Sequence, residues 1–208
     1  MCGVPFKAVD IYVKKALSLG YKIAICEQLT EPSNNSKEIV QRDVVRVITS
    51  GTIMEDSILD DKKNNYIMSI CYANAKFGLA WADITTGELC VSEIDIDENY
   101  SKLNDALVMI SPTEIICNQE FALLQNQISV FNQDVLKRPE SYLDYAFSLS
   151  RAEEETKQQL RTMSLKSFGI ENMKQSIMAL GGLFEYLKET QKRALPQINN
   201  KKIVSTTN

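Results

Sequence analysis

The stretch from residue 65 to residue 94 constrains the fold most, because its pattern predicts three consecutive β-strands. In the middle run, bulky side chains alternate with small ones: Phe77, Leu79 and Trp81 against Gly78, Ala80 and Ala82. Neighbouring side chains in a strand point to opposite faces, so the bulky face can fill a core while the small face admits a closely packed helix. The middle run is therefore predicted to be an interior strand of a layered sheet. The three runs are Tyr66–Tyr72, Phe77–Ile84 and Leu89–Ile94, separated by the short turns Ala73–Lys76 and Thr85–Gly87.

Composition excludes several classes of site. The 208 residues are 44% hydrophobic and 24% charged, which is enough for a sizeable core, and they include no histidine. Without histidine and without a C-x-x-C pair, a zinc site or a Cys/His nucleophile is nearly excluded. No apolar run approaches the ~20 residues that cross a bilayer, and we expect a cytoplasmic protein. The five cysteines are expected to be reduced thiols, mostly in the core: Cys2, Cys26, Cys71, Cys90 and Cys117.

Charge is distributed unevenly along the chain. The net charge is zero for residues 1–63, −8 for residues 64–150 and +4 for residues 151–208. Affinity for nucleic-acid phosphates comes from lysine and arginine, so the acidic, strand-rich middle is a poor surface for DNA. On charge alone, a solvated acidic face with no partner is an equally good interpretation.

The N-terminal residues predict a helix and two strands, which is only part of a domain. A helix is expected from Pro5 to Gly20, followed by strands at Tyr21–Cys26 and Asp43–Thr49 on either side of the polar loop Glu31–Ser36. The buried face of the helix is predicted to carry Val9, Tyr12, Val13, Ala16 and Leu17.

The segment after the three strands predicts alternating helices and strands. A helix capped by Asp97 or Asn99 leads to a buried strand, Thr113–Cys117, parallel to one of the first three. A helical turn at Phe121–Gln125 and a fifth strand at Ile128–Phe131 follow. This order is typical of a ribonuclease-H-like α/β fold, although it leaves other α/β folds open. The apolar face of the helix capped by Asp97 or Asn99 is predicted to carry Leu103, Ala106, Leu107 and Ile110.

Two more helices are predicted to cover the sheet. Arg151–Met163 carries Glu153–Glu155 in its first turn, where acidic residues match the helix dipole. Asn172 is expected to cap a longer helix that ends near Lys192. Gly181 and Gly182 in its middle indicate a close approach, which we assign to the face of Gly78, Ala80 and Ala82. The apolar face of this longer helix is predicted to carry Met173, Ile177, Leu180, Phe184 and Leu187. An unpaired, frayed strand is expected at Lys202–Ser205.

Six segments in order along the chain carry a resemblance to a known family. They are Gly3–Asp10, Leu19–Gln28, Val44–Thr52, Ala82–Glu88, Ser111–Ile116 and Tyr186–Lys192. These segments resemble the MutS family of DNA mismatch repair proteins. Lys7 and Ser50 depart from the family pattern, which commonly has histidine and proline at these two positions. Ser50 is expected to loosen the connection after the strand that ends at Thr49, because it lacks the fixed φ of proline.

The resemblance implies a domain organisation. Residues 1–55 correspond to the C-terminal part of domain I, which recognises mismatches, and 56–63 to a linker. Residues 64–192 correspond to domain II, the ribonuclease-H-like connector flanked by helices, and 193–208 to the start of the core domain. We therefore expect an excised piece of a longer protein, with a partial α/β recognition domain before the mixed-sheet connector.

The resemblance also implies a function. The family's Phe-x-Glu mismatch wedge is not in this chain, and no glycine begins a G-x-x-x-x-G-K-[ST] loop, so the ATP and Mg²⁺ sites of the family are expected elsewhere. No catalytic, cofactor or metal site is expected in these residues. The connector is expected to couple binding of mismatched DNA to the ATPase and to offer a surface to MutL. The full-length protein is expected to be a homodimer that does not bind membranes. DNA binding by these residues alone is expected to be weak or absent.

Two other functions stay open at this stage. Ribonuclease-H-like folds often hold metal ions on carboxylates at strand ends, so Asp83 and Glu114, with Asp134 nearby, are the candidates for a metal-dependent nuclease. Against this alternative, Asp83 precedes a turn, where aspartate bonds its own backbone, and Glu114 has no adjacent acid. A small-molecule-binding α/β domain is the third possibility, with no glycine-rich phosphate signature to support it.

Overall fold

The computed structural model describes residues 3–29, 41–54, 64–192 and 203–207. They form an N-terminal unit, residues 3–29 and 41–54, and a larger mixed α/β unit built on a six-stranded sheet. The predicted mixed sheet flanked by helices is confirmed, while its likeness to ribonuclease H stays a prediction. Among the described residues, no helix has the length and apolar character that crossing a membrane requires.

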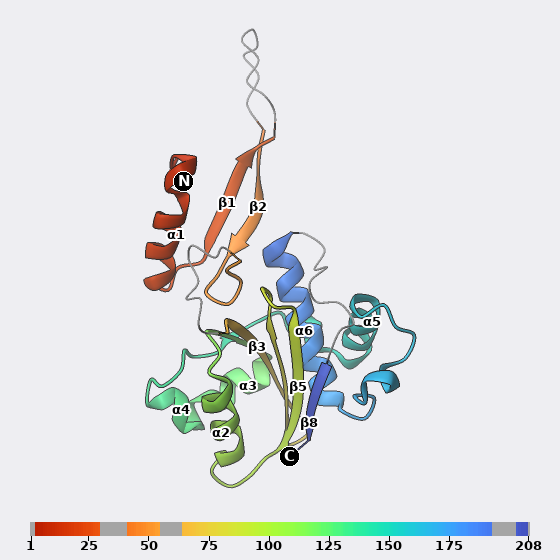
Figure 1. The fold of residues 1–208 in the computed structure, drawn as a ribbon. Helices are drawn as coiled ribbons and strands as arrows, with labels where there is room; N and C mark the ends of the chain where they lie inside the picture. Colours follow the sequence, from red (N-terminus) through yellow and green to blue (C-terminus); the bar gives the residue numbers. More distant parts are fainter. Residues whose placement is uncertain (1–2, 30–40, 55–63, 193–202, 208) are drawn as a thin grey trace.

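The N-terminal unit packs one helix beside a hairpin (Figure 1). A short 3₁₀ turn, η1 (Phe6–Ala8), leads into α1 (Val9–Ser18), and the antiparallel strands β1 (Ile23–Gln28) and β2 (Arg42–Ile48) follow. Gly20 ends the helix with φ +83°, as its position predicted. Tyr12 is exposed, so its predicted place on the buried face of the helix is wrong. The predicted loop Glu31–Ser36 lies outside the described residues. The small core is formed by Val13, Leu17 and Ile48.

The three predicted strands form the antiparallel centre of the sheet. They are β3 (Tyr66–Ala73), β4 (Lys76–Asp83) and β5 (Glu88–Asp95), with β4 in the interior as predicted. The strand β6 (Glu114–Cys117) runs parallel to β3, which confirms the predicted crossover. Parallel edge strands complete the sheet: β7 (Glu140–Ser141) beside β6, and β8 (Ile203–Thr207) beside β5. The strand Ile203–Thr207 is therefore paired, and the expectation of an unpaired strand at Lys202–Ser205 is wrong for its described residues.

Helices cover both faces of this sheet (Figure 1). The bulky face of β4 packs on the side of α2 (Ser101–Ile110), α3 (Gln119–Leu124), η2 (Gln125–Gln127) and α4 (Ser129–Asn132). The small face packs on the side of η3 (Asp144–Phe147), α5 (Leu149–Gln159), η4 (Leu165–Phe168) and α6 (Lys174–Gln191). The predicted division of β4 into a core-filling face and a helix-admitting face is confirmed. Cys71, Cys90 and Cys117 are buried free thiols, Cys26 is an exposed one, and Cys2 lies outside the described residues.

The predicted fifth strand, Ile128–Phe131, is wrong. Ile128 directly precedes the short helix α4, and residues 129–131 belong to that helix. The strand β7 lies beside β6 instead. A strand would send Val130 and Phe131 to opposite faces, but both are buried in the same cluster. Short apolar runs fit a buried helical turn as well as a strand, and here packing against α2 decides.

Two predicted helix starts also differ from the structure. Because α5 begins at Leu149, the three glutamates lie beyond its first turn and do not match the dipole; Glu153 pairs with Lys157, and Glu155 with Lys188. Asn172 does not cap α6. The Gln175 backbone N–H instead donates to the Glu93 carboxylate of β5, 3.1 Å away. A sheet residue therefore supplies the acidic group at this helix end.

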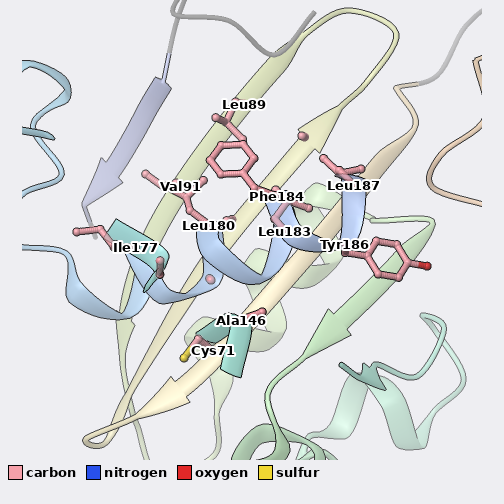
Figure 2. Close-up of a cluster of buried hydrophobic side chains, with 14 of the residues drawn as sticks. Cys71, Leu89, Val91, Ala146, Ile177, Leu180, Leu183, Phe184, Tyr186 and Leu187 are labelled. Atoms are coloured by element: carbon pink, nitrogen blue, oxygen red, sulfur yellow. The ribbon is translucent and has the colours of Figure 1, made fainter. Parts of the chain in front are cut away.

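The longest helix, α6, is buried along most of its length and packs directly on β4 and β5 (Figure 2). Its first turn lies so close to Gly78 that an added Cβ would be 2.0 Å from the Gln175 carbonyl carbon. Gly181 and Gly182 are buried as expected, but they approach Ala152 of α5 and Phe147 of η3. The predicted pairing of these glycines with Gly78 is wrong, since the N-terminal turn of α6 occupies that place.

Gly78→Ala should lower the free energy of unfolding by about 3 kcal/mol, because the new methyl group meets helix backbone that has no room to move. Urea unfolding followed by circular dichroism measures this change. The matched control is Gly3→Ala, where the added methyl group meets open space and stability should stay within about 0.5 kcal/mol. Equal midpoints for the two variants would contradict the close contact between α6 and β4.

Candidate functional site

The two units of the chain meet at a buried carboxylate. Glu114 begins β6 and is only 6% exposed. Its side chain lies on the α6 side of the sheet, since Ile116, two residues on, belongs to the apolar cluster on that side. A buried charge is costly unless its oxygens accept hydrogen bonds, so the donors around Glu114 define the site.

Three donors from two distant segments bind this carboxylate. Oε2 accepts from the Gly51 backbone N–H at 2.9 Å and from the Thr49 hydroxyl. Oε1 accepts from the Tyr186 hydroxyl at 2.6 Å. Thr49 and Gly51 follow β2 in the N-terminal unit, and Tyr186 belongs to α6. We call Thr49, Gly51, Glu114 and Tyr186 the joint.

A tight turn after β2 presents the first two donors. Thr52 N–H donates to the Thr49 carbonyl at 3.1 Å, and the Thr52 hydroxyl accepts from Thr49 N–H at 2.9 Å. A Cβ on Gly51 would lie 2.9 Å from both Glu114 Cβ and Ile67 Cβ. Glycine is therefore required at this position for the backbone to reach the carboxylate.

A second layer of polar contacts surrounds the joint. Ser50 Oγ donates to the Thr113 carbonyl at 3.2 Å, and Asn65 Nδ2 donates to the Ser50 carbonyl at 3.0 Å. Thr113 Oγ1 donates to Asn65 Oδ1 at 2.8 Å. The Ser50 hydroxyl thus makes a contact between the units. A proline, which the family resemblance leads us to expect at this position, has no donor for this contact.

Lys22 brings positive charge to the edge of the joint. Its ammonium lies 3.8 Å from Glu114 Oε1, forms an ion pair with Glu140 and sits 5.3 Å from the centre of the Tyr186 ring. Tyr142 packs edge-on against the same ring. Burial, together with the nearby negative charge of Glu114, raises the pKa of the Tyr186 phenol. The phenol therefore keeps its proton and stays a donor to the carboxylate.

The carboxylates predicted for a nuclease do not come together. Asp83 pairs with Tyr66 of β3, and Glu114 pairs with Ile67, the next residue of β3. Neighbouring positions along a strand project to opposite faces of the sheet, so the two carboxylates lie on opposite faces. Asp83 is buried and accepts from Asn65 N–H at 3.1 Å and from Thr85 N–H at 2.9 Å, as a turn-forming aspartate does. The exposed Asp134 lies in the loop after α4. Within the described ranges no three acidic or cysteine side chains are grouped to hold a metal ion, and the nuclease alternative receives no support.

Sequence reasoning placed Glu114 at the start of a buried strand but missed its partners. The signal for Gly51 was present, because a glycine directly after a strand indicates either a turn or a close approach. Thr49 and Tyr186 carry no comparable signal, since their contacts join residues 65 and 72 positions apart from Glu114.

Glu114→Ala should lower the free energy of unfolding by about 3 kcal/mol, because it leaves three buried donors without an acceptor. Thermal or urea unfolding of the variant measures the loss. Glu140→Ala is the matched control: it removes the other acidic partner of Lys22, but its side chain is 63% exposed, so the change should stay below about 1 kcal/mol. A Glu114 effect as small as that of Glu140 would show that the joint contributes little.

Comparison with known proteins gives matches over both units. The model of MutS domain I matches residues 1–57, and the model of MutS domain II matches residues 65–199. The DNA mismatch repair protein MutS of Caldanaerobacter subterraneus subsp. tengcongensis is 40% identical over 200 residues, covering 96% of this chain and 22% of that protein. MutS of Alkaliphilus oremlandii is 39% identical over 209 residues, and MutS of Syntrophomonas wolfei 35% over 212, each covering 100% of this chain and 24% of the relative. The chain thus spans about a quarter of the length of these relatives.

Proposed function

The chain belongs to the MutS family of DNA mismatch repair proteins, and from that premise we propose that its sheet unit is a connector that transmits mismatch binding to an ATPase. The observation that carries the proposal is the joint, where one buried carboxylate binds both the N-terminal unit and α6. A displacement of the turn at Thr49–Gly51 changes the environment of Glu114 and, through it, the position of Tyr186.

The balance of contacts supports a coupling role. The contacts between the units include the hydrogen bonds of the joint, of Ser50 and of Asn65, together with apolar packing of Met54 on the sheet unit. The sheet unit also has two large apolar clusters of its own. Hydrogen bonds are directional, so a joint made of them holds one geometry and is lost when that geometry changes. The sheet unit can therefore move as a body and keep its core.

The remaining parts of the proposal rest on the family. The domain limits at 1–55 and 64–192, the ATP and Mg²⁺ sites in other parts of the full-length protein, a surface for MutL, a homodimer and a cytoplasmic location all belong to it. The net charge of −8 over residues 64–150 supports protein contact over phosphate contact for the sheet unit.

A chimera tests the coupling. In Caldanaerobacter MutS, this chain replaces the 200 residues that it matches, and Glu114→Ala is introduced. Binding of heteroduplex DNA should stay within about threefold, while stimulation of ATP hydrolysis by a mismatch should fall about tenfold, since coupling between sites is typically worth 5–150-fold. Filter binding and steady-state ATPase assays give the two quantities. Glu140→Ala is the control and should preserve both; unchanged stimulation in Glu114→Ala would refute the coupling role.

The 208-residue chain alone should bind heteroduplex DNA weakly or not at all and without preference over homoduplex, because it has no Phe-x-Glu wedge to insert beside a mispair. A gel shift at physiological salt with matched duplexes checks this expectation. A clear preference for the mismatched duplex would place recognition within these residues.

A further inference from the structure

A groove beside the joint has the charge and shape to hold part of another protein. It lies between α1, the Ser111–Thr113 turn and the loop after α4, with a volume of about 480 Å³. Lys14 of α1 and Lys137 of the loop after α4 both line it, and no aspartate or glutamate of the described residues does. We call it the lysine groove.

The two lysines are available to a ligand. Both are exposed, and neither has an ion-pair or hydrogen-bond partner within the described ranges. The polar floor of the groove, in contrast, is already satisfied, since Ser50, Asn65 and Thr113 bond one another. A ligand therefore meets a pre-formed floor between two unpaired positive charges, an arrangement that complements an anionic group.

A second hollow continues the groove. It has a volume of about 300 Å³, lies between α2 and α4, and shares Val135 with the lysine groove. Its apolar lining is Val108, Met109, Val130 and Val135, and its polar lining is Asn104, Asp105, Ser129 and Gln133. Val108 and Val135 are 53% exposed, and Met109 is 78% exposed. Three large apolar side chains exposed side by side mark a contact surface, and methionine adapts to partners of different shape.

We propose that the lysine groove and this hollow together bind a peptide segment of a partner protein in which acidic side chains stand next to leucine-like ones. The acidic groups lie between Lys14 and Lys137, and the apolar side chains cover Met109 and Val135. A nucleic acid fits less well, because it offers no apolar side chains to cover the exposed Val108, Met109 and Val135 of the hollow. This proposal is independent of the coupling role.

Fluorescence anisotropy with the whole 208-residue chain tests it. The probe is a labelled hexapeptide, Glu-Leu-Asp-Ile-Leu-Asp, and its amide counterpart, Gln-Leu-Asn-Ile-Leu-Asn, isolates the contribution of charge. The acidic peptide should bind about tenfold more tightly than the amide peptide and weaken as salt rises. Equal affinity of the two peptides, or no binding of either, would overturn the proposal.

Variants locate the site. Lys14→Glu with Lys137→Glu should weaken the acidic peptide at least about tenfold, and Met109→Ser with Val135→Ser should weaken both peptides. The control is Lys166→Glu at the exposed η4 turn, compared with each single variant, Lys14→Glu and Lys137→Glu, and it should leave the affinity for both peptides unchanged. All of these side chains are exposed, and circular dichroism checks that each variant is folded. A labelled DNA duplex is titrated in parallel, and DNA binding that needs Lys14 and Lys137 without any peptide binding would assign the groove to phosphates instead.

Discussion

The contact between α6 and the small face of β4 is the constraint on which most of this structure depends. Gly78 leaves the space into which the backbone at Gln175 and Ser176 fits. The Ser176 hydroxyl then reaches the Ser92 carbonyl at 2.7 Å, and Glu93 accepts from the helix end. With its first turn fixed in this way, α6 runs across the sheet and delivers Tyr186 to the joint at its other end. One glycine on β4 thereby sets the position of a hydroxyl group that belongs to the site.

The core and the joint are stabilised by different physical interactions. Apolar burial on both faces of the sheet is non-directional. The joint has a charged acceptor whose donors come from the turn after β2 and from α6, and the N-terminal unit adds only a small apolar core of its own. The joint therefore favours one relative position of the two units through hydrogen-bond geometry, beside the apolar contact of Met54, while the integrity of the sheet unit depends on apolar burial.

The sequence predicted the parts of the fold that depend on local patterns. Alternation in Phe77–Ala82 identified the interior strand and its two faces, and Gly20 identified a helix end. Errors arose where tertiary contacts decide: the run at Ile128–Phe131 is helical because α2 and α3 surround it, and Asn172 is displaced as a cap by Glu93 of a distant strand. The site was found only in part for the same reason. Glu114 was noted as an isolated acid, but its donors lie far away in the chain, and no periodicity links them.

The choice of a carboxylate at the centre of the joint follows from what the joint must distinguish. An apolar side chain at position 114 would fill the same space with little regard to the angle between the units, because apolar packing has no preferred direction. A buried carboxylate is fully satisfied only when Thr49, Gly51 and Tyr186 are all in place, and losing one donor leaves its charge with less compensation. The energy of the joint therefore rises steeply as the units move apart. Under the coupling role that we propose, this steepness transmits a displacement in one unit to the other.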